Sequence, residues 1–434
     1  MKKKVSLFWF RRDLRLHDNH GLFEALQAKE AVLPIFIFDP AILESLSKND
    51  ARVEFIHHQL TEINASLQTH GSGVAVYHGS PEVILDKITN EFDVSAVYYN
   101  HDYEPYALER DAAISKLLES KSIAFKSYKD QVIFEKNQIT KDDGLPYKVY
   151  TPFSKKWLAA FNSEDCRAFD SENLLDHTHK SKSLNWVDLN AIGFEPNPVK
   201  VAPYKVEKEI IENYEATRNF PAVDGTSKLG PHLRFGTVSV REIVAKAIRH
   251  ENITFLKELI WREFFMQILW HFPHTVTRSF KPQYDAIKWR NDPEEFKKWC
   301  DGTTGYPLVD AGMRELNQTG FMHNRVRMLV GSFLCKHLLI DWRLGEAYFA
   351  EKLHDFELSS NVSNWQWVAG CGVDAAPYFR IFNPTTQVTN FDKAHTYIKK
   401  WVPEYQELTY PTPMVDHKFA RERCLTTYKE ALAK

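Results

Sequence analysis

Two tryptophans and several small residues lie close together at 364–370, where the sequence is NWQWVAG. An indole ring is large, flat, polarizable and readily oxidised, so Trp365 and Trp367 suit stacking on a planar heterocycle or the passage of an electron. Because they are two residues apart, they point in different directions on a helix or a turn. One can therefore face a cofactor while the other faces a ligand. The segment contains no metal-ligand motif and no obvious nucleophile.

A carboxylate, an indole and a guanidinium share one face of a predicted helix. Glu258, Trp261 and Arg262 are spaced i, i+3 and i+4. Such a face can line a pocket that stacks on a nucleobase and hydrogen-bonds its edge. The alternative is a half-buried tryptophan beside a surface ion pair, and the pattern alone leaves both open.

The same spacing recurs further along the chain. Asn324 and Met328 share a helix face, and Arg325 beside them can reach a phosphate. The alternative for Met328 is an ordinary core position.

The segment 226–230, TSKLG, offers two hydroxyls, backbone amides and a cation just before a predicted helix. These groups could cradle a diphosphate. Ser or Thr before a helix more often only caps it, and that alternative also stays open here.

The first 130 residues are predicted to form the scaffold of a parallel sheet. Near-continuous apolar runs at 5–10, 32–38, 74–77, 94–99 and 123–128 alternate with helical patterns. We therefore predict a doubly wound, five-stranded parallel α/β domain at 1–132, an interdomain linker at 133–204, and a nearly all-α domain at 205–434. Helix starts are predicted at Pro81, and at Pro293 after Asp292.

Composition limits the class of protein. The chain has 434 residues, 44% of them hydrophobic and a net charge of −2, so two domain cores are expected. The net charge is −6 over residues 1–199 and +4 over 200–434, which places any phosphate-binding surface in the second half. Five widely spaced cysteines argue against disulfides and against a zinc site, so no metal is predicted. No membrane-spanning run or signal peptide is recognisable, so a cytoplasmic protein is expected.

Five blocks of sequence resemble the photolyase/cryptochrome family, and class I cyclobutane pyrimidine dimer photolyases in particular. They occur in the family's order and span nearly the whole chain. They are WFRRDLRL at 9–16, TSKLGPHLRFG at 226–236, TGYP at 304–307, MHNR at 322–325, and the segment 364–385. Several long independent matches are far more specific than one short glycine pattern.

The resemblance implies that the cofactor is FAD, active as FADH⁻. Lys228 and Gly230 stand where the family often has Arg and Ser. Asn361 is implied to lie beside the flavin nitrogen N5, where an amide hydrogen-bonds without supplying an acidic proton; this favours repair over signalling. The implied FAD-binding residues are Tyr214, Thr226, Ser227, Lys228, Leu229, Gly230, Arg262, Arg327, Asp355, Glu357 and Asn361.

The resemblance also implies the groups that act on DNA. Glu258 and Trp261 would face the pyrimidine dimer, with Glu258 stabilising its radical anion, and Trp367 would stack on it. A relay of Trp365, Trp342 and Trp289 would carry electrons between the flavin and the surface; the alternative is that these rings simply fill a helical core. The implied catalytic residues are Glu258, Asn361, Trp289, Trp342 and Trp365, and the implied DNA-binding residues are Arg218, Glu258, Trp261, Asn324, Arg325, Met328, Trp367 and Arg380.

The resulting hypothesis is a light-dependent DNA repair enzyme, a deoxyribodipyrimidine photolyase that splits cyclobutane pyrimidine dimers by electron transfer from photoexcited reduced FAD. The lesion would be flipped out of the base stack. A cryptochrome-type blue-light photoreceptor and a six-four photolyase remain alternatives; Asn361 opposes the first, and Asn324 and Met328 oppose the second.

The expected partner is damaged DNA, with no membrane and no obligate protein partner, and the protein is expected to be a monomer. The segment 100–107, NHDYEPYA, resembles the family's antenna region. The resemblance therefore predicts a site for a second chromophore. Folate, flavin and deazaflavin all stay open as its identity.

Overall fold

The computed structural model describes residues 2–181 and 183–433, which group into two compact units. Unit 1 comprises Met1–Glu135, Ala160–Pro203 and Leu229–Arg249, and unit 2 comprises Lys136–Ala159, Tyr204–Lys228 and His250–Lys434. The chain thus crosses between the units several times. The segment 133–204, predicted as a linker, is shared between both units and contains helix α6 (Tyr150–Ala160).

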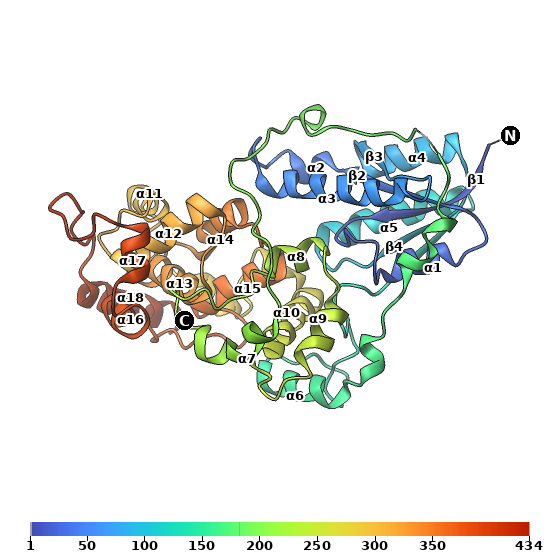
Figure 1. Ribbon diagram of the computed structural model, residues 1–434. Coiled ribbons are helices and arrows are strands. Elements are labelled where there is room, and N and C mark those ends of the chain that lie inside the picture. Colours follow the sequence, from blue (N-terminus) through green and yellow to red (C-terminus); the bar gives the residue numbers. More distant parts are fainter. Residues whose placement is uncertain (1, 182, 434) are drawn as a thin grey trace. The chain divides into compact units, whose positions relative to one another are not determined.

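Unit 1 contains a five-stranded parallel sheet with strand order β3-β2-β1-β4-β5 (Figure 1). This confirms the predicted α/β fold class. The strands are β1 (Lys4–Phe10), β2 (Val32–Phe38), β3 (Ala75–His78), β4 (Asp93–Asn100) and β5 (Ala124–Tyr128). Each strand begins and ends within one residue of the run predicted from the sequence.

Strands β1, β2 and most of β4 are buried on both faces, which explains their continuous apolar runs, whereas the edge strand β5 is mostly exposed. Along β1, Phe8 and Phe10 pack into one core and Leu7 and Trp9 into another, because side chains alternate along a strand. The helices of this unit are α1 (His20–Leu26), α2 (Pro40–Leu43), α3 (Ala51–Gln68), α4 (Pro81–Glu91), α5 (Pro105–Ser120), α8 (Gly230–Phe235) and α9 (Val240–Ala247), with 3-10 turns at Ser163–Cys166, Ser171–His177 and Leu189–Ile192.

Helices α8 and α9, predicted in the helical domain, pack with the sheet. Gly236 ends α8 with φ of +66°, and a Cβ there would lie 2.1 Å from the carbonyl oxygen of Arg12. Only glycine allows this left-handed, close approach to the loop after β1.

A buried ionic network holds α9 to this unit. Both Arg15 and Arg241 bind Asp130, at 2.7 Å and 2.8 Å, and Arg241 also binds Asp18 at 2.9 Å. Burial alone would raise the pKa of Asp130, but the two guanidinium groups outweigh burial and lower the pKa to about 2. The network is therefore ionised at neutral pH.

Unit 2 is helical, as predicted for the second half of the chain. Its core is aromatic and includes Trp299, Trp342 and Trp365. All five cysteines are free thiols. Besides most of α6, the helices are α7 (Lys208–Thr217), α10 (Thr254–His271), α11 (Pro293–Asp301), α12 (Pro307–Thr319), α13 (Asn324–Ser332), α14 (Trp342–Lys352), α15 (Leu358–Ala369), α16 (Pro384–Phe391), α17 (Thr396–Trp401) and α18 (His417–Leu432), with 3-10 turns at Pro273–Val276 and Pro282–Ala286 and a π-helical turn at Phe333–His337.

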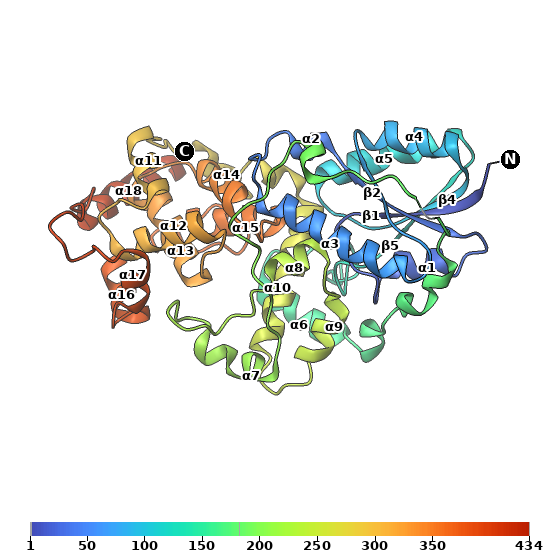
Figure 2. The ribbon, with the colours of Figure 1, turned by 45° about the horizontal axis from the view of Figure 1, so that its top comes forward.

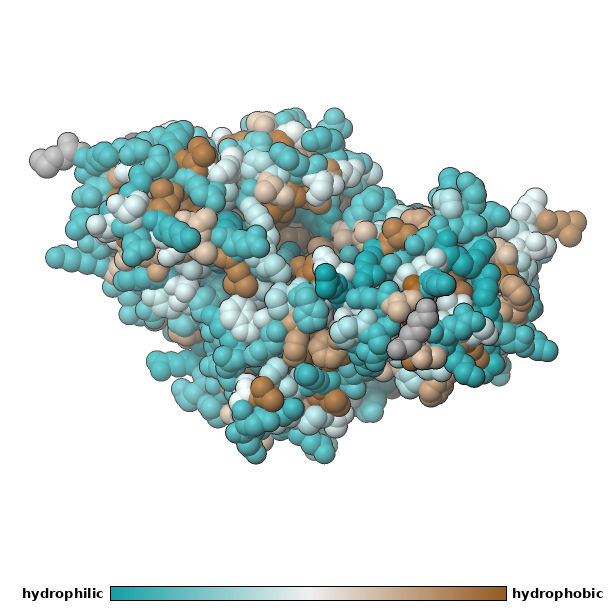
Figure 3. All heavy atoms as spheres, turned by 180° about the vertical axis from the view of Figure 1, so that it is seen from behind, coloured by the Kyte–Doolittle hydropathy of each residue, from teal (hydrophilic) through white to brown (hydrophobic). Residues whose placement is uncertain are grey.

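Within the described residues, no helix is both long and apolar enough to cross a bilayer. The face drawn in Figure 3 is mostly hydrophilic, with hydrophobic side chains scattered over it.

We predict that Asp130→Asn destabilises the protein by about 3–5 kcal/mol, because two buried guanidinium groups lose their shared counter-charge. Since Asp130 has a depressed pKa, its contribution is present above its unfolded value near pH 3.8 and is lost as the pH falls towards about 2. Urea unfolding at pH 7 and at pH 3 measures both effects. The control is Asp86→Asn, which removes a partly exposed pair with Lys121 and should change stability by less than about 1 kcal/mol. An Asp130→Asn effect no larger than that of the control would contradict the network's role.

Candidate functional site

Helices α14 and α15 lie side by side in unit 2 and carry several of the predicted site residues (Figures 1 and 2). Both amide hydrogens of Asn361 on α15 are used by Glu346 on α14. Its Nδ2 donates to the Glu346 carbonyl oxygen at 3.0 Å and to Oε1 at 2.8 Å. These two acceptors fix the orientation of the amide and leave Oδ1 as its remaining polar atom. Burial raises the pKa of Glu346.

Two arginines neutralise the carboxylates that precede α15. Arg327 binds both oxygens of Asp355, at 3.1 Å and 2.9 Å, and Arg262 binds Glu357 at 3.1 Å. Glu357 is 5% exposed, so its charge needs this partner. All four of these residues were predicted from sequence; the pairing between them was not.

The segment Thr226–Lys228 contains polar groups with unused hydrogen-bonding capacity. The Thr226 hydroxyl oxygen is buried and lacks a hydrogen-bond partner in the part of the chain that the structure describes. Lys228 has φ of +55°, and its Nζ lies 3.5 Å from the centre of the Phe321 ring. Burial lowers the pKa of Lys228, and no carboxylate among the described residues forms an ion pair with it. A half-buried ammonium group and an unpartnered hydroxyl together suit an anionic group with several acceptor oxygens.

The other residues of this predicted set are placed as follows. The backbone carbonyl oxygen of Ser227 accepts the backbone N–H of Lys205 at 2.8 Å, Leu229 is buried, and Gly230 is the first residue of α8. The chain passes from unit 2 to unit 1 between Lys228 and Leu229. Tyr214 lies on α7 with Arg218 5.2 Å from its ring centre.

The three side chains predicted to share one face of α10 each contact a different residue. Glu258 binds Arg218 at 2.6 Å, Arg262 binds Glu357, and Trp261 stacks on Tyr150 with ring centres 3.6 Å apart and planes 6° from parallel. Burial raises the pKa of Glu258, although the Arg218 guanidinium acts in the opposite direction. A third of the Glu258 side chain is still exposed. Tyr150 was missed because nothing in the sequence links position 150 to position 261.

At the start of α13, Asn324 is exposed and Arg325 is held in place. The Arg325 guanidinium donates to Asn219 Oδ1 and lies 4.3 Å from the Phe391 ring centre. Its Nη1 is 3.8 Å from Met328 Sδ, so Met328 is half-buried against the arginine. The predicted grouping of these side chains on one helix is therefore observed, but Arg325 already has partners.

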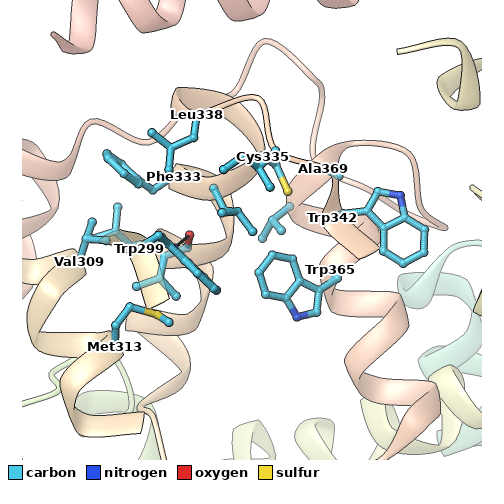
Figure 4. Packing of buried hydrophobic residues seen from close by; sticks show 14 of the residues in the cluster. Trp299, Val309, Met313, Phe333, Cys335, Leu338, Trp342, Trp365 and Ala369 are labelled. Carbon is cyan, nitrogen blue, oxygen red and sulfur yellow. Dashed lines mark hydrogen bonds between the residues drawn. The ribbon is translucent and has the colours of Figure 1, made fainter. Parts of the chain in front are cut away.

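The tryptophans differ in burial. Trp365 and Trp342 are 3% and 1% exposed, and Trp289 is half-buried with its ring centre 6.1 Å from that of Tyr428. Figure 4 shows Trp365 between Trp342 and Trp299. Trp299, which sequence reasoning passed over, meets Trp365 edge to face at 6.1 Å.

The absence of a side chain at Gly345 on α14 leaves the space that the Trp365 ring occupies. A Cβ at Gly345 would lie 2.2 Å from Trp365 Cη2, so any larger residue would displace the indole. Trp367 is half-buried two residues further along α15, and Arg380 is exposed with its guanidinium 5.5 Å from the Phe382 ring centre.

In unit 1, the segment 100–107 runs from the end of β4 into α5. The Tyr106 hydroxyl donates to Asp39 at the end of β2, and the Arg110 guanidinium lies 4.9 Å from the Trp9 ring centre. The carboxyl ends of parallel strands are where α/β sheets bind ligands. A second chromophore stays a prediction, with folate, flavin and deazaflavin all open.

Comparison with known proteins connects this geometry to a family. Residues 6–172 match the family model described as DNA photolyase, and residues 255–409 match the model for the FAD binding domain of DNA photolyase. The deoxyribodipyrimidine photo-lyase of Agrobacterium fabrum is 36% identical over 99% of this chain and 98% of its own length. The chain belongs to the photolyase/cryptochrome family. The Escherichia coli deoxyribodipyrimidine photo-lyase is 34% identical over 98% of this chain and 99% of its own length.

Solved structures agree with the sequence comparison. A class III photolyase from Agrobacterium tumefaciens superposes with a TM-score of 0.90, 34% identity and coverage of 100% of this chain and 99% of that one. A Sulfolobus tokodaii photolyase with two FAD molecules gives a TM-score of 0.81 at 32% identity, with 98% and 100% coverage. A Synechocystis cryptochrome gives 0.83 at 26% identity, with 98% and 99% coverage. The predicted family, photolyase enzyme class and FAD cofactor are confirmed.

The residues of this photolyase-family chain fit FAD. The unpartnered Thr226 hydroxyl and the unpaired Lys228 ammonium suit its diphosphate. The Asn361 Oδ1 atom remains available as an acceptor for a flavin N–H. We therefore assign these groups to the cofactor-binding surface as a hypothesis.

We predict that Gly345→Ala destabilises the protein by about 1–3 kcal/mol, because the new methyl group overlaps the buried Trp365 ring. The matched control is Gly331→Ala on α13, where a Cβ would lie 3.1 Å from Val368 and 3.6 Å from Trp365. Both glycines are helical, so both variants gain the same helix propensity. Chemical denaturation measures the difference; equal stability of the two variants would contradict the proposed packing.

Proposed function

We propose that this protein is a light-driven DNA photolyase that splits cyclobutane pyrimidine dimers. The observation that carries the proposal is the pair of groups on α10, a carboxyl with a raised pKa at Glu258 and an indole held flat against Tyr150 at Trp261. Such a pair can stack on a pyrimidine and hydrogen-bond its reduced carbonyl. The relatives named deoxyribodipyrimidine photo-lyase support the same lesion.

When bound, reduced and excited by light, FAD supplies the electron that opens the cyclobutane ring and recovers it afterwards. The chain's own residues position the lesion and stabilise the negative charge that develops on it. Arg218 holds Oε1 of Glu258, which leaves Oε2 to face the lesion. Because the pKa of Glu258 is raised, its proton is held more readily than an ordinary glutamate's and can be shared with negative charge on the dimer.

The side chain of Asn361 presents a fixed, non-acidic acceptor at the proposed flavin face. Since Glu346 accepts both amide hydrogens, Oδ1 cannot exchange places with Nδ2 without breaking two hydrogen bonds. This arrangement does not supply a proton to the flavin, and that property favours repair over photoreceptor signalling. The similar Synechocystis protein is a cryptochrome, so a photoreceptor remains the second candidate.

The proposal is tested by illuminating the reduced protein with blue light on two oligonucleotides, one bearing a cyclobutane dimer and the other a six-four photoproduct. We expect restoration of the cyclobutane dimer alone. Restoration of the six-four photoproduct alone would assign the other lesion, and restoration of neither would favour a photoreceptor.

We predict that Trp342→Phe abolishes light-driven reduction of bound FAD, because phenylalanine is much harder to oxidise than the buried Trp342 indole. Repair by chemically pre-reduced protein should stay close to that of the wild type. Flavin absorbance under illumination and the repair assay separate the two effects. Trp186→Phe in unit 1 is the control and should change neither; loss of both activities in Trp342→Phe would contradict the relay.

DNA binding should depend on Arg380, which is exposed and has no ion pair among the described residues. We expect Arg380→Ala to weaken binding to lesion-bearing DNA and to reduce the slope of log affinity against log salt by about 0.9, the value for one phosphate contact. Arg290→Ala removes an arginine already paired with Glu295 at 2.6 Å and should leave the slope unchanged. An unchanged slope in Arg380→Ala would remove it from the phosphate-binding set.

A further inference from the structure

His323 is a buried side chain whose function is not explained by the residues assigned so far. It is 3% exposed and precedes the first residue of α13. Its Nδ1 accepts the backbone N–H of Arg325 at 3.2 Å, as a helix cap does. The ring hydrogen of neutral His323 therefore lies on Nε2. That atom is buried and has no hydrogen-bond partner in the described chain.

The ring is neutral because of its surroundings. Burial and the nearby cations Lys228, Arg327, Arg325 and Arg218 lower the pKa of His323 to about 4. A neutral ring with Nδ1 committed to the helix cap has one possibility left, which is to donate from Nε2. A buried donor rarely lacks an acceptor, so a group outside the chain is the natural partner.

The cations around His323 show which kind of acceptor fits. Arg327 and Arg218 are already paired with Asp355 and Glu258, but Lys228 forms no ion pair among the described residues. Lys228 and Arg327 both lie over the Phe321 ring, at 3.5 Å and 5.8 Å, two residues before His323.

The carboxylate of Glu315 does not fill this role. Its Oε2 atom accepts the backbone N–H of His323 at 3.2 Å and the Tyr397 hydroxyl at 2.6 Å, and in the described chain it makes no hydrogen bond to His323 Nε2. An anion is therefore needed where Lys228 and the Nε2–H group are unsatisfied.

We propose that the Nε2–H group of His323 donates a hydrogen bond to the diphosphate of FAD, in one anion site with the Lys228 ammonium and the Thr226 hydroxyl. Lys228 is one of the cations acting on His323 and lies over Phe321, Thr226 is two residues before Lys228, and the Thr226 hydroxyl and His323 Nε2 both lack a partner in the described chain. The inference rests on FAD binding, which the family establishes, and not on the lesion that the enzyme repairs.

The experiment separates the two roles of His323. His323→Asn keeps an acceptor for the Arg325 N–H, because asparagine is a good helix cap, but removes the Nε2 donor. His323→Ala removes both. We expect His323→Asn to melt like the wild type without FAD and to bind FAD about 10- to 100-fold more weakly, as expected for loss of a hydrogen bond to a charged acceptor. His323→Ala should show the same loss and a lower melting temperature.

Inorganic pyrophosphate identifies the part of FAD that is bound. It should compete with FAD for the full-length apoprotein, and this competition should weaken in His323→Asn by a factor similar to that for FAD. His250→Asn, which changes a histidine paired with Glu212, is the control and should bind both as the wild type does.

Wild-type FAD affinity in His323→Asn would overturn the proposal, and so would weaker FAD binding with unchanged pyrophosphate competition. Unchanged FAD binding with weaker binding of DNA would also overturn it, by assigning Nε2 to a DNA phosphate. The proposed function is judged separately by whether the wild-type protein repairs a dimer, so failure of one does not imply failure of the other.

Discussion

The packing of α14 against α15 is the constraint on which the proposed chemistry depends. One contact joins Asn361 to Glu346 through two hydrogen bonds, and the next turn places Trp365 over Gly345. The first fixes the orientation of the amide that we propose faces the flavin, and the second sets the position of the Trp365 ring that we propose passes electrons. Because both contacts lie along the same pair of helices, a shift of either helix would change the proposed flavin environment and the start of the proposed electron relay together.

The distribution of paired and unpaired charge supports the proposal that the site binds anionic groups. Arg262, Arg327 and Arg218 each have a carboxylate partner, so their charges are largely balanced within the chain. Lys228 is half-buried without an ion pair among the described residues, and Arg380 is exposed without one. The paired arginines line the proposed site with their charges already balanced. The unpaired cations would gain the most electrostatic stabilisation from a bound phosphate.

Much of the fold follows from local pattern. The apolar runs of β1, β2 and β4 became strands because the inner part of a parallel sheet is buried on both faces, as the alternation of Phe8 and Trp9 between two cores shows. The predicted start of α11 is also confirmed, since Asp292 accepts the backbone N–H groups of Glu294 and Glu295. These signals lie within a few residues of one another, where sequence is most informative.

The site was only partly predictable because its partners are distant in sequence. Helical spacing placed Glu258, Trp261 and Arg262 on α10, but it could not show that each would meet a different partner. Tyr150 and Glu346 carry no recognisable motif and acquire their roles only through tertiary packing. The resemblance to the family named the cofactor and its residues, whereas the unpartnered atoms of Thr226 and His323 could be found only in the structure.

The most direct test of the α14–α15 constraint is a neutron or atomic-resolution X-ray structure of the FAD-bound protein, which distinguishes oxygen from nitrogen in the Asn361 side chain. The account predicts that Nδ2 stays hydrogen-bonded to Glu346 and that Oδ1 faces the isoalloxazine ring. An Asn361 side chain with Nδ2 directed at the flavin, or turned away from it, would contradict the account.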